Sequence, residues 1–221
     1  MNKYIKIQNA LYGKYTEPET SLINIIKPIG FSILCCLIYL ERENYATTWV
    51  GQIMDIMDLD KRTVNKYLAI LQKNKIIDCD IDLVKCKKKD TFTINLESYM
   101  NMEGGFELIP VSIFLKHYKT IKDSGWLILC FLTKNHHTLF GSISNEGFAT
   151  MSEVVIGTHL GLNKNTVHTY VHLLAKNKII KMTQGKNIMT GYDEVGKEAY
   201  SYFPNEYVVP FKVKIKVKVE E

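Results

Sequence analysis

Two stretches of the sequence place basic and hydrogen-bonding side chains at the spacing of one helix face. TVNKYLAILQKNKII begins at Thr63, and TVHTYVHLLAKNKII begins at Thr166. The fork of an arginine matches guanine O6 and N7, asparagine pairs in a similar two-bond way with adenine, and lysine suits phosphate oxygens. These residue types at this spacing therefore predict contacts to the bases and backbone of a double-stranded nucleic acid.

The inward-facing positions of the two stretches agree, whereas the outward-facing positions differ. Apolar residues recur at 64, 67, 68 and 71 and again at 167, 170, 171 and 174, which buries one side of each helix. The predicted contacts are Lys61, Arg62, Thr63, Asn65 and Lys66 in the first stretch, and Lys164, Asn165, Thr166, His168, Thr169 and His172 in the second. One scaffold that reads two different base sequences would show this pattern. Two ordinary solvated helix faces are the alternative.

The segment KCKKKD, residues 85–90, adds a cluster of lysines after the first stretch. We predict a hairpin over residues 78–96 with Lys87, Lys88 and Lys89 at its tip. Lysines at such a tip can contact phosphates without regard to base sequence. A turn of lysines is also common in soluble proteins without any nucleic-acid contact.

The similarity extends well beyond these helices and divides the chain in two. Residues 45–78 and 148–181 are identical at 14 of 34 positions. Upstream, GFSILCCLIYL from Gly30 matches GWLILCFL from Gly125, so the second copy has eight extra residues, within HHTLFGSISNEG. We place the boundary between the two copies at NMEGG, residues 101–105. The repeat therefore predicts two domains, residues 1–102 and 103–221.

Each half predicts the same order of elements and an α+β, helix-rich fold. An apolar helix (31–43 or 126–135) precedes a short strand, a second helix, a tight turn and the polar helix described above. Asp60 and Asn163 suit its N-cap, and Thr150 with Glu153 predicts a capping box on the second helix of the second half. Residues 181–209 predict a longer hairpin than the one in the first half.

This order of elements resembles the winged helix-turn-helix family, twice in tandem. The residues that carry the resemblance are Leu160, Gly161, Leu162, Thr166, Val167, Tyr170 and Leu174, echoed by Leu59, Thr63, Val64, Tyr67 and Leu71. In the first half, Met57 and Asp58 replace the Leu-Gly of the usual turn.

Tandem proteins of this kind resemble bacterial transcription regulators and plasmid or phage replication initiators, which implies a partner of double-stranded DNA. We expect a transcription regulator that reads two dissimilar half-sites, with a replication initiator as the alternative. A homodimer or a protein of the transcription or replication machinery is a further possible partner. Winged-helix adaptors of chromosome condensation, which bind proteins instead of DNA, are the alternative of another class.

The composition predicts a cytoplasmic protein, and the expected DNA binding implies that it is nucleoid-associated. The chain has 221 residues, of which 46% are apolar and 23% charged, with a formal net charge of +5. Its most apolar run, residues 31–40, is about half the length of a membrane-spanning helix, and the N-terminus does not resemble a signal peptide. The five cysteines include no C-x-x-C pair and predict free thiols.

The final segment FKVKIKVKVEE, residues 211–221, alternates lysines with aliphatic residues and predicts a strand with one wet face. Edge lysines of this kind commonly prevent aggregation. Contact with DNA and strand exchange between subunits are the alternatives.

No set of residues predicts catalysis or a cofactor. Residues 191–198 fit the spacing of a phosphate-binding loop, but Glu198 replaces the Ser or Thr that holds magnesium. Cys35 and Cys36 lie in an apolar helix and predict core packing, not nucleophiles. His168 and His172 have a spacing that zinc can use, but the sequence nearby offers no third ligand, so base or phosphate contact is preferred. We expect no enzyme, no cofactor and no metal.

Overall fold

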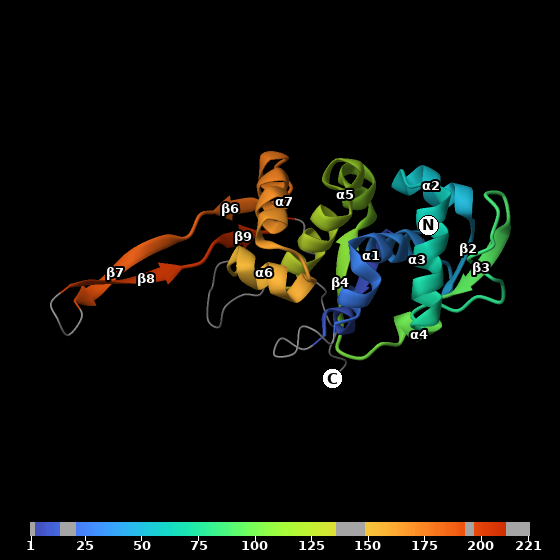
Figure 1. The fold of residues 1–221 in the computed structure, drawn as a ribbon, viewed down its shortest axis with the longest axis horizontal. Coiled ribbons are helices and arrows are strands. Elements are labelled where there is room, and N and C mark those ends of the chain that lie inside the picture. Colours follow the sequence, from blue (N-terminus) through green and yellow to red (C-terminus); the bar gives the residue numbers. More distant parts are fainter. Residues whose placement is uncertain (1–2, 14–20, 136–148, 193–196, 211–221) are drawn as a thin grey trace, which may run out of the picture.

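The computed structural model describes residues 3–13, 21–135, 149–192 and 197–210, and it has an α+β fold. Helices α1 and α5 lie in the middle, α2 and α3 on one side of them, and α6 and α7 on the other, while the β7–β8 hairpin projects from the end of the molecule (Figure 1). All of the sheets in the described part of the chain are small and antiparallel. The eight-residue insertion and the C-terminal strand predicted above lie outside the described residues.

The elements follow one another in a similar order on both sides of residues 101–105. The first half contains β1 (Tyr4–Gln8), the 3-10 helix η1 (Asn9–Tyr12), α1 (Leu22–Leu40), β2 (Tyr45–Trp49), α2 (Val50–Met57), α3 (Lys61–Lys73), β3 (Thr91–Asn95) and α4 (Glu97–Met100). The second half contains β4 (Phe106–Pro110), α5 (Val111–Lys134), β5 (Ala149–Thr150), α6 (Glu153–Leu160), α7 (Lys164–Lys176), β6 (Lys181–Thr183), β7 (Lys186–Tyr192), β8 (Glu198–Phe203) and β9 (Glu206–Val208).

The predicted starts and buried faces of α3 and α7 are confirmed. Asp60 Oδ1 accepts a hydrogen bond from the Thr63 amide at 3.0 Å, and Asn163 Oδ1 accepts one from the Thr166 amide at 2.7 Å. Each bond satisfies an amide that has no partner within its own helix. The inward faces are fully apolar where they are most buried, at Val64, Leu68 and Leu71 in α3 and at Val167, Val171 and Leu174 in α7.

Both α3 and α7 follow a tight turn with a left-handed residue. Gly161 ends α6 with φ 61° and ψ 32°, and Asp58 ends α2 in the same region with φ 55° and ψ 47°. The replacement of glycine by Asp58 has therefore not changed the type of turn. Asp58 forms an ion pair with Lys122 of the second half at 3.0 Å, and the lysine lowers the pKa of its carboxyl group.

Strands from the two halves form one of the sheets. β1 pairs antiparallel with β4, with Tyr4 opposite Pro110, Lys6 opposite Leu108 and Gln8 opposite Phe106. Helix α1 also packs against α5, and the buried side chains of both halves form one continuous cluster. The two halves consequently share a core, although each has its own set of outer helices.

Helices α1 and α5 are both broken at a lysine. Lys27 has φ 59° and ψ 168°, and Lys122 has φ 52° and ψ −168°, in a region that non-glycine residues rarely adopt. Pro28 follows the first break and disfavours a helical conformation at the residue before it. Across the second break, the Tyr118 hydroxyl donates a 2.6 Å hydrogen bond to Asp123. The ion pair between Lys122 and Asp58 adds a further restraint there.

Helix α1 begins earlier than predicted, and it is long and apolar enough to cross a membrane. However, 61% of its apolar window is buried inside the fold. That burial is typical of the core helix of a soluble protein. The five cysteines are all free and buried, as expected, and burial raises the pKa of Cys35 to about 12.

Two local predictions are wrong. No strand precedes β3 between residues 74 and 90, so the first half has no regular hairpin there; β3 pairs instead with β2. The capping box is also wrong, because the N-cap of α6 is Ser152, whose side chain accepts from the Val155 amide at 3.2 Å. In the second half, β5, β9 and β6 form a sheet, and the long β7–β8 hairpin extends beyond it, as Figure 1 shows.

The polar helices approach the central helices closely at two glycines. A Cβ atom at Gly125 would lie 2.9 Å from Tyr170 Cδ1, and one at Gly30 would lie 3.1 Å from Tyr67 Cδ1. Tyr67 and Tyr170 are half-buried and project from α3 and α7. The same glycine–tyrosine contact therefore positions α3 on α1 and α7 on α5.

We predict that Gly125→Ala lowers the free energy of unfolding by about 1–2 kcal/mol, because overpacking typically costs about 1–3 kcal/mol and the gain in helix propensity offsets up to about 1 kcal/mol of it. Gly30→Ala should cost less, since its added carbon has slightly more room. Urea unfolding of both variants measures this, with Ser112→Ala at an exposed position of α5 as the control. Unchanged stability of Gly125→Ala would contradict the close approach of α7 to α5.

Candidate nucleic-acid interface

The start of α3 presents three cations to solvent. Lys61, Arg62 and Lys66 are all exposed, and no ion pair is recorded for them among the described residues. Thr63 is half-buried, and its hydroxyl donates to Asp60 Oδ2 at 2.6 Å, so this side chain reinforces the helix cap. The outward side of α3 consequently offers three exposed charged groups, of which the Lys66 ammonium lies 5.5 Å from the centroid of the Tyr67 ring, while Thr63 stabilises the start of the helix.

The prediction that Asn65 lies on the outward face is wrong. Only 5% of Asn65 is exposed, and its Nδ2 donates hydrogen bonds to the Val84 carbonyl at 3.1 Å and the Cys86 carbonyl at 3.0 Å. The irregular loop of residues 74–90 folds over this side of α3, which the spacing within the helix alone cannot show. Asn65 therefore anchors the loop and is not available for a base.

The anchored loop brings the three lysines close to α2 and α3. Lys87, Lys88 and Lys89 are exposed, and the Lys87 amide donates to Asp90 Oδ2 at 2.8 Å in a tight turn. The Lys88 carbonyl accepts from the Gly51 amide at 2.9 Å, at the start of α2. The charge of Lys61 also acts on the Cys86 thiol, whose pKa burial raises. We call Lys61, Arg62, Lys66, Lys87, Lys88 and Lys89 the basic surface.

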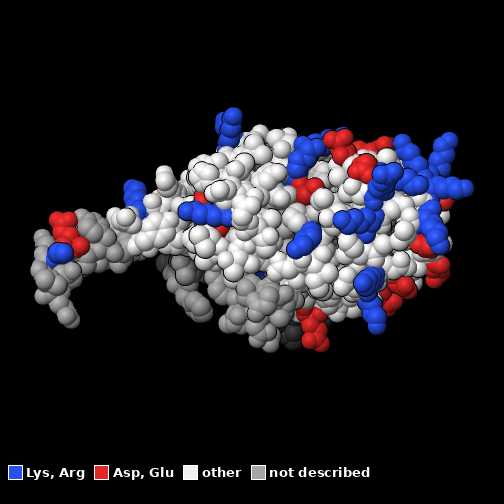
Figure 2. Space-filling model, in the orientation of Figure 1, with Lys and Arg blue, Asp and Glu red and all other residues white. Residues whose placement is uncertain are grey.

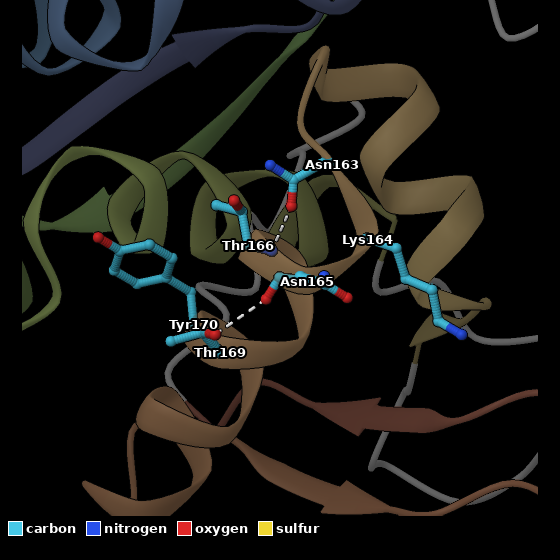
Figure 3. Close-up of a pocket in the computed structure, with 6 residues that line it drawn as sticks. All are labelled: Asn163, Lys164, Asn165, Thr166, Thr169 and Tyr170. Atoms are coloured by element: carbon cyan, nitrogen blue, oxygen red, sulfur yellow. Dashed lines mark hydrogen bonds between the residues drawn. The ribbon is translucent and has the colours of Figure 1, made fainter.

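The outward face of α7 is polar but carries fewer cations. Lys164, Asn165, His168, Thr169 and His172 are exposed. In Figure 3, Lys164 and Tyr170 extend to opposite sides of a shallow depression at the start of α7, and Asn165 lies between them. The Thr169 hydroxyl donates to the main-chain carbonyl of Asn165 at 2.9 Å, and the side chain of Asn165 is exposed.

Thr166 lies half-buried at the cap of α7, where its amide binds Asn163. The two threonines that were predicted as contacts, Thr63 and Thr166, thus occupy matching positions beside an N-cap residue. Their amides complete the first turn of each helix. Both side chains lie at the edge of the exposed face, not at its centre.

A second depression lies between α7 and the base of the β7–β8 hairpin. It is lined by Ser152, Glu153, Val154, Lys164, Asn165, His168, His172, Met182, Gln184, Gly185, Tyr202 and Asn205. The side chains of His168 and Glu153 meet there, with Nδ1 3.0 Å and 3.2 Å from the two carboxylate oxygens. The imidazole rings of His168 and His172 are in contact, with centroids 4.2 Å apart and ring planes tilted by 54°.

Glu153 is the site residue that the sequence did not reveal. It lies 15 positions from His168 and belongs to the preceding helix, so the spacing within α7 gives no sign of it. Its only sequence signal was the pattern Thr150–Glu153, which we assigned to a capping box. Because Ser152 forms the cap instead, the Glu153 carboxylate is free to face α7.

On the face drawn in Figure 2, the described cations are distributed unequally. Figure 2 shows Lys and Arg side chains gathered over the part formed by α2, α3 and β3, with Asp and Glu between them, and fewer over α6 and α7. The formal net charge of +5 is modest for the whole chain. Any attraction for a polyanion would therefore depend on local clusters of cations such as the basic surface, and not on the net charge of the chain.

Similarity to known proteins does not indicate a function for these residues. No protein-family model matches the chain, and no curated protein matches it. The exposed faces of α3 and α7 carry cationic and hydrogen-bonding side chains, the types that contact anionic polymers.

We predict different effects on stability for Asn65 and Asn165, the two asparagines that the sequence predicts as nucleic-acid contacts. Asn65→Ala should lower the free energy of unfolding by about 1–3 kcal/mol, because the Val84 and Cys86 carbonyls lose a buried partner. Asn165→Ala, at an exposed position, should change it by less than about 0.5 kcal/mol. Urea unfolding compares the two. Equal effects would mean that Asn65 does not hold the loop.

Proposed function

We propose that the protein is a transcription regulator that binds double-stranded DNA in a sequence-specific manner. The exposed faces of α3 and α7, which differ in their residues, would contact the DNA, and we call them the two reading heads. The observation that carries this proposal is the exposed basic surface at the start of α3. Lys61, Arg62 and Lys66 project from one helix whose opposite side is fully apolar, and the anchored lysine turn lies beside them. Arg62 suits a guanine edge, and the lysines suit the phosphates on either side of it.

The proposal includes two winged helix-turn-helix units in tandem. The helix–turn–helix of α2 and α3 and that of α6 and α7 support it, as do the matching left-handed turns at Asp58 and Gly161. The β7–β8 hairpin would be the wing of the second unit. The first unit departs from the pattern, since an irregular loop, and not a hairpin, stands at the place of its wing.

The relation between the halves suggests how the two reading heads are oriented. The β1–β4 pairing places the start of each strand opposite the end of the other. The α2–α3 turn contacts α5 through Asp58 and Lys122, and Gly161 of the α6–α7 turn lies beside Asn24 of α1. Such reciprocal contacts are typical of two-fold symmetry. We therefore expect two dissimilar half-sites in inverted orientation, about one helical turn or roughly 10 base pairs apart.

The alternative roles differ in what the DNA site should look like. A replication initiator would use the same heads on repeated sites at an origin and would also contact replication proteins. A protein adaptor would use its outer helices without DNA, and the exposed cations of the basic surface argue against that role for the first half. An association with the nucleoid follows from the proposal.

Selection of bound duplexes from a random pool tests the proposal. We expect one consensus with two unlike halves in inverted orientation. No enrichment of any sequence would contradict DNA reading and favour the adaptor. Enrichment of two half-sites in direct orientation would retain the function but contradict the symmetric arrangement of the heads.

We predict that Arg62→Ala weakens binding to the selected duplex by about 1–3 kcal/mol and relaxes the preference at one base pair. Lys88→Ala should weaken selected and random duplexes alike and reduce the salt dependence by about one phosphate contact. Fluorescence anisotropy at several salt concentrations measures both effects. Lys73→Ala, exposed at the opposite end of α3, is the control. Equal loss on both duplexes for Arg62→Ala would show that this residue does not read a base.

A further inference from the structure

Three side chains at the edge of α7 bring three potential metal-ligand atoms close together. Glu153 begins α6, and His168 and His172 lie one turn apart on α7. One donor atom from each of the three lies within 4.8 Å of the other two. Among the described residues, this is the group of histidine, cysteine and carboxylate side chains that has the geometry for an ion.

The spacing of these donors is close to that of a tetrahedral zinc site. Two ligands that share a zinc ion at about 2.05 Å lie roughly 3.3 Å apart. His168 Nδ1 is 3.0 Å and 3.2 Å from the Glu153 oxygens, so this pair already has that separation. His172 is exposed, and a small rotation of its ring would complete the set. Two imidazoles and one carboxylate leave a fourth position for water or another oxygen.

The surroundings make the three side chains accessible to an ion without exposing all of them fully. The His168 side chain is 58% exposed, whereas that of Glu153 is 11% exposed. The depression beside them opens to solvent, and among the described residues that line it the one other charged group is Lys164, on the same face of α7. The carboxylate is thus held in place by the fold, and the imidazoles remain free to adjust.

The matching positions of the first half do not provide such a site. Val50, Asn65 and Ala69 stand where the second half has Glu153, His168 and His172, at the same separation of 103 residues. The arrangement of helices that the two halves share therefore does not require these three residue types. Their combination is a property of the second half alone.

We propose that Glu153, His168 and His172 bind a divalent transition-metal ion of the zinc class. Binding replaces the hydrogen bond between His168 and Glu153 with two bonds to the ion and releases any proton that this pair holds. The open position faces the depression between α7 and the β7–β8 hairpin. An ion there adds two positive charges to the half of the molecule in which Figure 2 shows fewer cations.

Metal titration of the full-length protein tests the site directly. We expect one Zn²⁺ per chain, measured by competition with a chromophoric chelator, and a visible absorption spectrum of tetrahedral nitrogen–oxygen coordination with Co²⁺. His172→Ala and Glu153→Gln should each weaken binding at least tenfold, because even the loss of a residue that only supports a ligand costs about 10- to 100-fold. His117→Ala, a half-buried histidine of α5, should leave the affinity unchanged.

Several results would overturn the site. Absence of stoichiometric Zn²⁺, equal binding by wild type and His172→Ala, or a sulfur-to-metal charge-transfer band from the buried cysteines would each do so. Thermal unfolding of the variants without metal provides the control for folding, and His172 is exposed enough that its replacement should leave the melting temperature unchanged.

A second measurement concerns the effect of the ion on DNA, and it alone rests on the proposed function. Zn²⁺ should strengthen binding to the selected duplex at least several-fold, because its charge and open position suit a phosphate oxygen. Glu153→Gln should remove this increase and retain metal-free binding, because Glu153 belongs to the metal set and not to the predicted DNA contacts. Binding of Zn²⁺ without any DNA binding would contradict the proposed function but retain the site. DNA binding that Zn²⁺ does not change would contradict the link between them.

Discussion

The antiparallel pairing of β1 with β4 is the contact on which the arrangement of the two halves depends. It joins the first described strand of the chain to the strand that follows the boundary between the two copies, and the packing of α1 against α5 continues the same junction. Main-chain hydrogen bonds hold a strand pair together whatever its outward side chains are. The outer helices can therefore differ in their exposed residues while the core between them stays the same.

That freedom explains why the two polar helices have become unequal. In the first half, Asn65 has turned inward to hold an irregular loop, and the loop in turn brings three lysines beside α3. In the second half, the matching residue is His168, which is exposed and meets a carboxylate from α6. The same position of the repeat thus holds a loop in place in the first half, through Asn65, and provides an exposed imidazole in the second half, through His168.

The sequence predicted those features that depend on neighbours along the chain. The periodicity of apolar residues identified the buried sides of α3 and α7, and Asp60 and Asn163 were correctly assigned as caps. Asn65 was misjudged because its partners, the carbonyls of Val84 and Cys86, lie about 20 positions away in a loop without a regular pattern. Glu153 was missed for the same reason. Whether a polar residue faces solvent or protein is decided by distant segments, which helix periodicity does not contain.

The breaks in α1 and α5 differ in what maintains them. Pro28 makes the first break a property of the local sequence, because a proline restricts the residue before it in any context. Asp123 follows the second break and imposes no such restriction, so the unusual backbone of Lys122 depends on Tyr118 and on Asp58 from the other half. Separated from the first half, α5 would lose one of these restraints and gain by straightening. Helix α5 would then have to bend again at Lys122 before the second half could pack against the first. Packing of the two halves would thus select the broken form of α5 over the straight one.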